Sequence, residues 1–142
     1  MTWPRDERVA MEAFYGRHEL NAEGQPTAAW EAAHLVRIEP PSPMVLAWDE
    51  SVRVRRIVCH RLVAESLKRA LVAIDEHYAS ISDVALLVAG LHRFGGVYNY
   101  RPVKDGHRLS THAWAAAIDL NPQANALRTK GTMPAAVIVS VP

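Results

Sequence analysis

The length, composition and charge of this sequence point to one folded domain. It has 142 residues, of which 49% are hydrophobic and 22% charged, and 16 Lys and Arg nearly balance 15 Asp and Glu to give a net charge of +1. These proportions are typical of a globular protein and exclude a disordered or low-complexity polymer, and the near-zero charge gives no general attraction to nucleic acid. We therefore expect a single domain over residues 1–142.

The N-terminal part is predicted to be a short helix followed by a surface loop. Pro4 is suited to the first turn of a helix, Val9 is expected on its inward face, and Gly16 ends it. Residues 17–33 are rich in Asn, Gly, Gln, Pro and Ala, and they are predicted to form an ordered loop in which Trp30 is the large anchor.

The middle of the chain is predicted to contain short strands and the main helix. Residues 34–39, 44–48 and 52–58 are β-type runs, and a proline-rich turn separates the first two. Residues 60–78 place apolar side chains at helical spacing and charged side chains between them. This amphipathic stretch is therefore predicted to be the main helix.

The last predicted elements are strands. Residues 84–91 are an apolar run whose class the periodicity does not decide. Residues 97–101 alternate as in a strand, and residues 115–120 are typical of a buried strand that ends at Asn121 and Pro122. The expected fold class is α+β, with one main helix packed against a small sheet.

The single cysteine and the N-terminal residues indicate where the protein is made. With Cys59 alone, no disulfide can form within the chain, so folding needs no oxidising compartment. Residues 1–8 carry both charge signs and lead into no signal-peptide core, and no window approaches the roughly 18 apolar residues of a membrane span. We expect synthesis in the cytoplasm without a signal peptide, and no membrane span.

Most histidines and the one arginine cluster are interpreted as structural. Because Cys59 and His60 are neighbours in an extended segment, they point to opposite faces and cannot act as a pair. Four other histidines have no partner at a suitable spacing and are interpreted as ordinary surface or hydrogen-bonded residues: His18, His34, His77 and His92. The arginines at 53, 55, 56 and 61 are interpreted as a solvated strand face, and an edge that binds nucleic acid or protein is the alternative.

His112 and Asp119 are the strongest candidates for chemistry. A turn followed by a strand can bring the two side chains to one point when the intervening residues are small, as several alanines between them are. Imidazole nitrogen and carboxylate oxygen both bind zinc at about 2.0 to 2.2 Å, and a catalytic zinc needs three protein ligands and an open position. Two of the three ligands are therefore visible here.

The segment around this pair resembles the signature of a zinc peptidase family. Ser110-x-His112-x-x-Ala115-x-Ala117-x-Asp119 is similar to the Ser-x-His-x-x-Gly-x-Ala-x-Asp pattern of D-alanyl-D-alanine carboxypeptidases and phage L-alanyl-D-glutamate endopeptidases. The flanking stretches that extend the resemblance over most of the chain are residues 3–4, 14–16, 35–41, 95–102 and 108–110.

The resemblance implies a fold of the D,D-peptidase and Hedgehog type, one zinc ion, and cleavage of stem peptides in bacterial peptidoglycan. His112 and Asp119 would be zinc ligands, and Arg101 and Ser110 would hold the substrate carboxylate or the scissile carbonyl oxygen. A guanidinium suits a carboxylate, and zinc polarises a carbonyl and activates water. The protein would be a phage or prophage cell-wall lysin, delivered to the wall by a holin or a phage particle.

The sequence departs from the family pattern at two points. In the family a third histidine ligand and an acidic general base lie on a later segment, whereas no histidine follows His112 here, so no catalytic residue is identified and we expect that segment to be missing. His107 is a sterically allowed substitute ligand. Ala115 replaces the signature glycine, and a positive φ there would cost about 1 kcal/mol.

Two further readings stay open beside the zinc peptidase. A non-catalytic remnant of the family would hold cell-wall peptides without cutting them. A binding domain that uses the arginine edge would belong to a different class, and the balanced charge argues against it.

Overall fold

The computed structural model of the chain describes residues 2–101 and 109–125. Its elements, in chain order, are α1 (Arg8–Tyr15), α2 (Ala28–His34), β1 (Leu35–Ile38), β2 (Met44–Leu46), β3 (Asp49–Val54), β4 (Ile57–His60), α3 (Ala64–Ala79), α4 (Ala85–Val88), β5 (Arg93–Gly96), the 3-10 turn η1 (Thr111–Trp114), β6 (Asp119–Leu120) and α5 (Pro122–Asn125). Small sheets and several helices confirm the α+β class. None of the helices in these ranges is long and apolar enough to cross a membrane.

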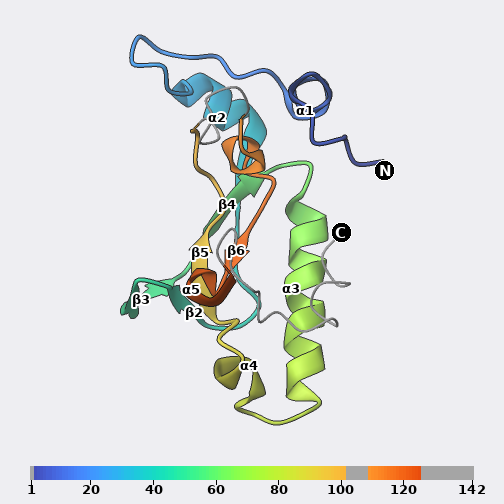
Figure 1. Cartoon of the computed structure of the whole chain (residues 1–142), viewed down its shortest axis with the longest axis vertical. Coiled ribbons are helices and arrows are strands. Elements are labelled where there is room, and N and C mark those ends of the chain that lie inside the picture. Colours follow the sequence, from blue (N-terminus) through green and yellow to red (C-terminus); the bar gives the residue numbers. More distant parts are fainter. Residues whose placement is uncertain (1, 102–108, 126–142) are drawn as a thin grey trace.

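The described strands form two small sheets beside the longest helix (Figure 1). β1 and β4 pair antiparallel, and the second sheet has the order β3-β2-β5-β6. In that sheet β2 and β5 are parallel, and both outer pairs are antiparallel. The strand that carries Asp119, β6, is therefore the last strand of the second sheet within the described ranges.

The main core lies between α3 and the sheets. Leu71, Ile74 and Tyr78 on the inward face of α3 are buried together with Ile57 from β4 and Leu120 from β6. Burying one such apolar side chain stabilises the fold by about 1.5 to 3 kcal/mol. The prediction of a main amphipathic helix is confirmed, and the helix begins at Ala64, after a turn.

A second cluster joins the N-terminal helices to the segment that contains η1. Met11 and Tyr15 of α1 and Trp30 of α2 are buried against Ala113 and Trp114 of η1. Because the two halves of this cluster are far apart in the sequence, it fixes the position of η1 relative to the start of the chain.

Two predictions for the N-terminal part were wrong. Val9 is 81% exposed, whereas Met11 and Tyr15 are buried. The helix begins at Arg8, and the face that carries Met11 and Tyr15 packs inward against Trp30 and Trp114. Residues 28–34 are helix α2 and not loop, because the Thr27 side chain accepts a hydrogen bond from the Trp30 N–H and caps the first turn. Trp30 is nevertheless the buried anchor, as predicted.

Strand positions were only partly predicted. Residues 34–39 and 44–48 contain β1 and β2, as expected. The predicted strand at 97–101 is not formed, since the strand lies earlier, at Arg93–Gly96. In the run 115–120 only Asp119–Leu120 is a strand, because the chain first turns through a left-handed residue after η1.

Candidate functional site

The site begins with the capped turn η1. The Ser110 hydroxyl oxygen accepts a hydrogen bond from the His112 backbone N–H at 3.2 Å, which closes the turn. Ala113 and Trp114 are buried, whereas His112 is only partly buried. The buried pair anchors the turn, and His112 is left with access to solvent.

Ala115 reverses the chain after this turn. It adopts the left-handed conformation, with φ 55° and ψ 38°, and its side chain is fully buried. Its backbone N–H donates to the His112 carbonyl oxygen at 3.0 Å. This is the position where the resembled signature has glycine, so the positive φ costs about 1 kcal/mol here.

The reversal brings His112 and Asp119 together. His112 Nε2 lies 3.3 Å from Asp119 Oδ1, so the predicted proximity of the two side chains is confirmed. His112 Nδ1 lies 2.8 Å from the Val97 carbonyl oxygen. Because a carbonyl oxygen only accepts, Nδ1–H is the donor, and Nε2 is the nitrogen that faces the carboxylate. The His112 side chain is 18% exposed and that of Asp119 is 52% exposed, so the pair is open to solvent.

The two side chains shift each other's protonation. The hydrogen bond with Asp119 raises the pKa of His112, and partial burial opposes this effect. The same hydrogen bond lowers the pKa of Asp119, again against burial. The positive charge of Arg101 lowers the pKa of both groups. The pair is therefore stabilised as imidazolium and carboxylate, and a cationic side chain acts on both partners.

The two predicted substrate-binding residues are placed differently. Arg101 is exposed, and its charge acts on the His112 and Asp119 pair. The Ser110 oxygen caps η1 by accepting from the His112 N–H, and a hydroxyl group can also donate to an acceptor. Their contact with a substrate stays a prediction.

The donor atoms fit part of a zinc site. An imidazole whose Nδ1–H is held by a carbonyl presents Nε2 to a metal, and a carboxylate is a common partner ligand. Within residues 2–101 and 109–125, however, no group of three or more His, Cys, Asp or Glu could hold a metal. His107, the substitute ligand, lies outside the described residues. The described part of the chain thus offers two of the three protein ligands.

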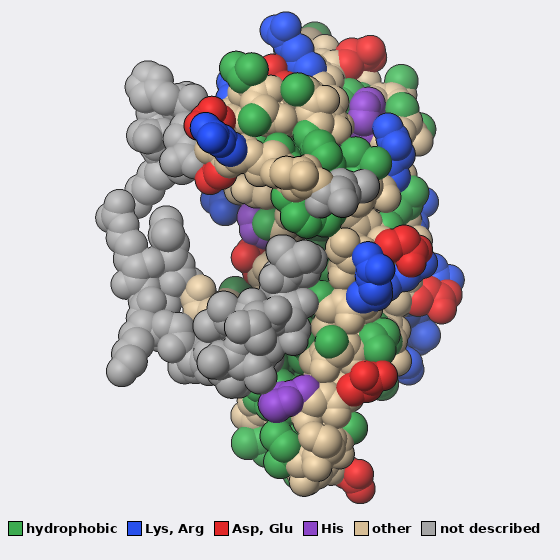
Figure 2. Space-filling model, turned by 90° about the vertical axis from the view of Figure 1, so that its right-hand side faces the viewer, with side chains coloured by type: hydrophobic (Ala, Val, Ile, Leu, Met, Phe, Trp, Pro, Cys, Tyr) green, Lys and Arg blue, Asp and Glu red, His purple; other side chains and the backbone are tan. Residues whose placement is uncertain are grey.

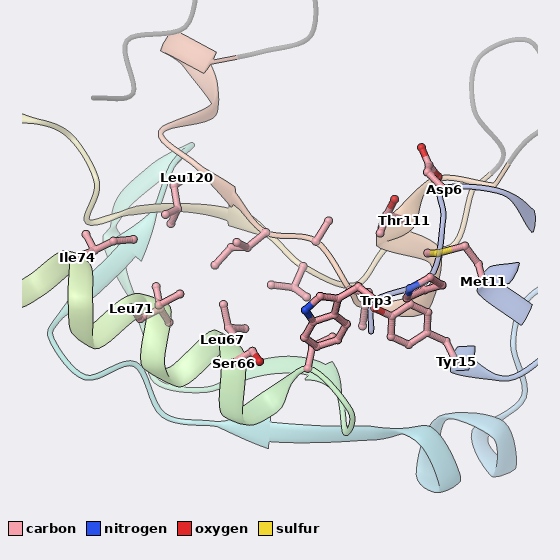
Figure 3. A pocket seen from close by; sticks show the side chains of 18 residues that line it. Trp3, Asp6, Met11, Tyr15, Ser66, Leu67, Leu71, Ile74, Thr111 and Leu120 are labelled. Atoms are coloured by element: carbon pink, nitrogen blue, oxygen red, sulfur yellow. The ribbon is translucent and has the colours of Figure 1, made fainter. Parts of the chain in front are cut away.

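An apolar cavity of about 210 Å³ lies between residues 115–118 and helix α3 (Figure 3). Leu67, Leu71 and Ile74 of α3 line it together with Trp3 and Leu120. Leu120 points into the cavity in Figure 3, and neighbouring residues of a strand point to opposite faces, so the Asp119 side chain faces away from it. Neither His112 nor Asp119 lines this cavity, so it does not contain the candidate site.

Three histidines lie in one aromatic cluster that the sequence did not reveal. The Trp30 ring stacks with His18 and His34 at centroid distances of 4.3 and 4.5 Å, and the Tyr15 ring meets His60 edge-on at 4.9 Å. His18 Nε2–H donates to the Ala113 carbonyl. These rings support the fold, and no local spacing reveals them because their partners come from distant segments.

The interpretation of Cys59 agrees with the structure, whereas that of the arginines agrees only in their exposure. Cys59 is fully buried, and burial raises the pKa of its thiol to about 11, so it is not a nucleophile. All four arginines are exposed, but the predicted strand at 52–58 is divided into β3 and β4, so Arg53 lies in a strand and Arg55, Arg56 and Arg61 lie outside one. Arg56 pairs with Glu39 at 3.1 Å. Lys and Arg side chains also lie beside Asp and Glu on the face shown in Figure 2.

Comparison with known proteins adds no assignment. No protein-family model, no curated protein and no solved structure matches this chain.

Proposed function

We propose that this chain is a domain of a zinc-dependent peptidase that acts on peptidoglycan stem peptides, with a fold of the D,D-peptidase type. The observation that carries the proposal is the His112 and Asp119 pair, with 3.3 Å between Nε2 and Oδ1 and with Nδ1 held by the Val97 carbonyl. It supports the resemblance because the two side chains that the signature assigns to zinc converge in space, although six residues separate them.

Each side chain has a role that follows from its chemistry. His112 would hold zinc through Nε2 and Asp119 through its carboxylate. A zinc ion bound there supplies Lewis acidity and lowers the pKa of its bound water to about 7. The exposed Arg101 guanidinium would orient a stem-peptide carboxylate through a two-point hydrogen bond, which keeps the peptide in register with the metal.

Zinc binding and peptide cleavage test this proposal together. We expect the full chain to bind zinc in calorimetric titration and to release new termini from purified muropeptides, as detected by mass spectrometry. His112→Ala and Asp119→Ala should each weaken zinc binding at least tenfold, because each removes one inner ligand. His77→Ala, at an exposed histidine of α3, is the matched control and should bind zinc as the unmodified chain does. Failure to bind zinc at any loading rejects the proposal.

A non-catalytic stem-peptide-binding domain is the second candidate. It is favoured by the donor count, since residues 2–101 and 109–125 contain no complete metal group and two ligands bind zinc weakly. Retention of muropeptides without new termini would select this function. In either case we propose that the protein is made in the cytoplasm and reaches the wall through a holin or a phage particle.

A further inference from the structure

The pairing of β5 with β6 contains an irregularity directly opposite Asp119. Phe94 pairs with Leu120, and Gly96 pairs with Asp119, so two steps along β5 match one step along β6. The extra residue is Gly95, which makes this a β-bulge. Bulges redirect side chains at the edges of sheets, and they often lie beside functional sites.

The space around Gly95 is filled by the residues of β6 and α5. A Cβ atom at position 95 would lie 2.9 Å from Asp119 Cβ, 3.2 Å from the Asp119 carbonyl oxygen and 2.8 Å from Pro122 Cγ. Gly96 is a different case. Its φ of +123° favours glycine, but a Cβ there would meet nothing within 4 Å. Gly95 therefore matters through contact and Gly96 through backbone conformation.

The chain that follows the bulge holds the other member of the pair. The Val97 carbonyl accepts from the His112 ring at 2.8 Å, and the Asn99 N–H donates to the His112 carbonyl at 3.0 Å. At the opposite end of β5, the Asn121 N–H donates to the Arg93 carbonyl at 2.9 Å. One short stretch thus fixes both the strand of Asp119 and the ring of His112.

We propose that Gly95 is a positioning residue of the candidate site: its missing side chain lets Asp119 approach β5 closely enough to meet His112 Nε2. His112 and Asp119 are the two residues to which the proposed function assigns zinc. The role of Gly95 in bringing them together does not require that function, but the use of the pair as zinc ligands rests on it. Its test accordingly uses the full chain free of metal, so a failed hydrolase assay and a failed positioning test are separate results.

Side-chain nitrogen NMR at a fixed pH tests the proposal. Asp119→Asn defines how far the His112 Nε2 signal moves when the carboxylate is lost. We expect Gly95→Ala to move this signal at least half as far in the same direction, because the new methyl group displaces Asp119. The Nδ1 signal should move much less, since its hydrogen bond to the Val97 carbonyl does not involve Asp119. A merely structural role of Gly95 would leave the Nε2 signal unchanged.

Two control variants separate contact from strain. Gly96→Ala adds backbone strain in open space, and Gly24→Ala does the same far from the site in sequence, where φ is +75° and nothing lies within 4 Å. Both should leave the Nε2 signal within a quarter of the Asp119→Asn change. The proposal is overturned if the Nε2 signal moves as far in Gly96→Ala as in Gly95→Ala, or if it does not move in Gly95→Ala. It is also overturned if Asp119→Asn leaves the signal in place.

A double variant and a proximity measurement cover the case of misfolding. Gly95→Ala with Pro122→Ala removes the contact with Pro122 Cγ and keeps the contact with Asp119, so it should fold better and still move the Nε2 signal. In the unmodified chain, an NOE between the Gly95 α protons and the Asp119 β protons is expected. If neither alanine variant folds, this NOE decides, and its absence rejects the close approach.

Discussion

His60 and His112 carry the same imidazole but differ in what surrounds it. His60 is fully buried, its Nε2–H donates to the Tyr15 carbonyl, and its Nδ1 accepts from the Leu62 N–H, so both nitrogens are satisfied in the neutral form. His112 is partly exposed and faces a carboxylate. Burial therefore lowers the pKa of His60 to about 4, whereas Asp119 raises that of His112.

His60 is predicted to make stability depend on acidity. Its pKa is about 4 in the folded chain and 6.5 in the unfolded chain, so the unfolded state binds more protons between these values. The contribution of His60 is complete above pH 6.5 and is lost as the pH falls toward 4, by up to about 1.4 kcal/mol per pH unit. Urea unfolding at pH 7, 6 and 5 measures this slope.

The matched comparison for this slope is His60→Asn against His77→Asn. The first variant removes the buried titrating group and keeps a donor and an acceptor, so its stability should fall less steeply with acid than that of the unmodified chain. The second removes an exposed imidazole and should keep the original slope. Equal slopes in all three proteins would show that His60 does not titrate differently on folding.

At the residue scale, the sequence predicted that His112 and Asp119 lie close together, but it did not predict the backbone group that holds the His112 ring. The small residues between His112 and Asp119 made their convergence predictable, because a reversed chain can bring a turn and a strand together. The Val97 carbonyl could not be predicted, since a backbone acceptor leaves no mark in the sequence. Ser110 could be a turn cap or a substrate-binding residue from its position in the sequence, and the structure shows the cap.

At the scale of elements, the turn from η1 into β6 depends on Ala115. Valine at this position should lower the free energy of unfolding by more than about 2 kcal/mol, because a β-branched side chain strongly disfavours the left-handed conformation that this residue adopts. Denaturant unfolding measures the loss. Ala116→Val, at a half-buried neighbour, is the control and should cost less than half as much.

Glycine at Ala115 should change stability little. It removes the backbone strain of about 1 kcal/mol but also removes a buried methyl group, worth about 0.8 kcal/mol, so the two effects nearly cancel. A valine variant as stable as the unmodified chain would show that this residue is not held in the left-handed conformation.

Element types were predictable where one pattern ran for many residues. The helix at 64–79 has a sustained apolar face, which fixes both its type and its inward side. The strand near residue 95 was predicted too late in the sequence, because Gly95 and Gly96 are typical of a turn before a strand. In the structure both glycines lie inside β5. Glycine suits position 95 because β6 lies so close that a side chain there would collide with it.

At the scale of the molecule, the site turn depends on contacts that span most of the chain. The Trp114 indole N–H donates to the Gly16 carbonyl at 3.0 Å, and the His18 ring donates to the Ala113 carbonyl at 2.7 Å. Local periodicity cannot reveal such contacts, because their partners are 98 and 95 positions apart. The position of η1 relative to α1 and α2 could therefore not be predicted from the sequence.

Trp114→Ala tests this dependence. The Trp114 side chain is 1% exposed, so its removal should leave a cavity and an unpaired Gly16 carbonyl and lower the free energy of unfolding by about 3 to 5 kcal/mol. Trp48→Ala is the matched control, because that ring is 68% exposed and its loss should cost about 0.5 kcal/mol or less. Comparable losses in the two variants, measured by denaturant unfolding, would mean that the N-terminal helices do not hold the site turn. A large loss confined to Trp114→Ala would show that the contact of η1 with the N-terminal segment stabilises the fold.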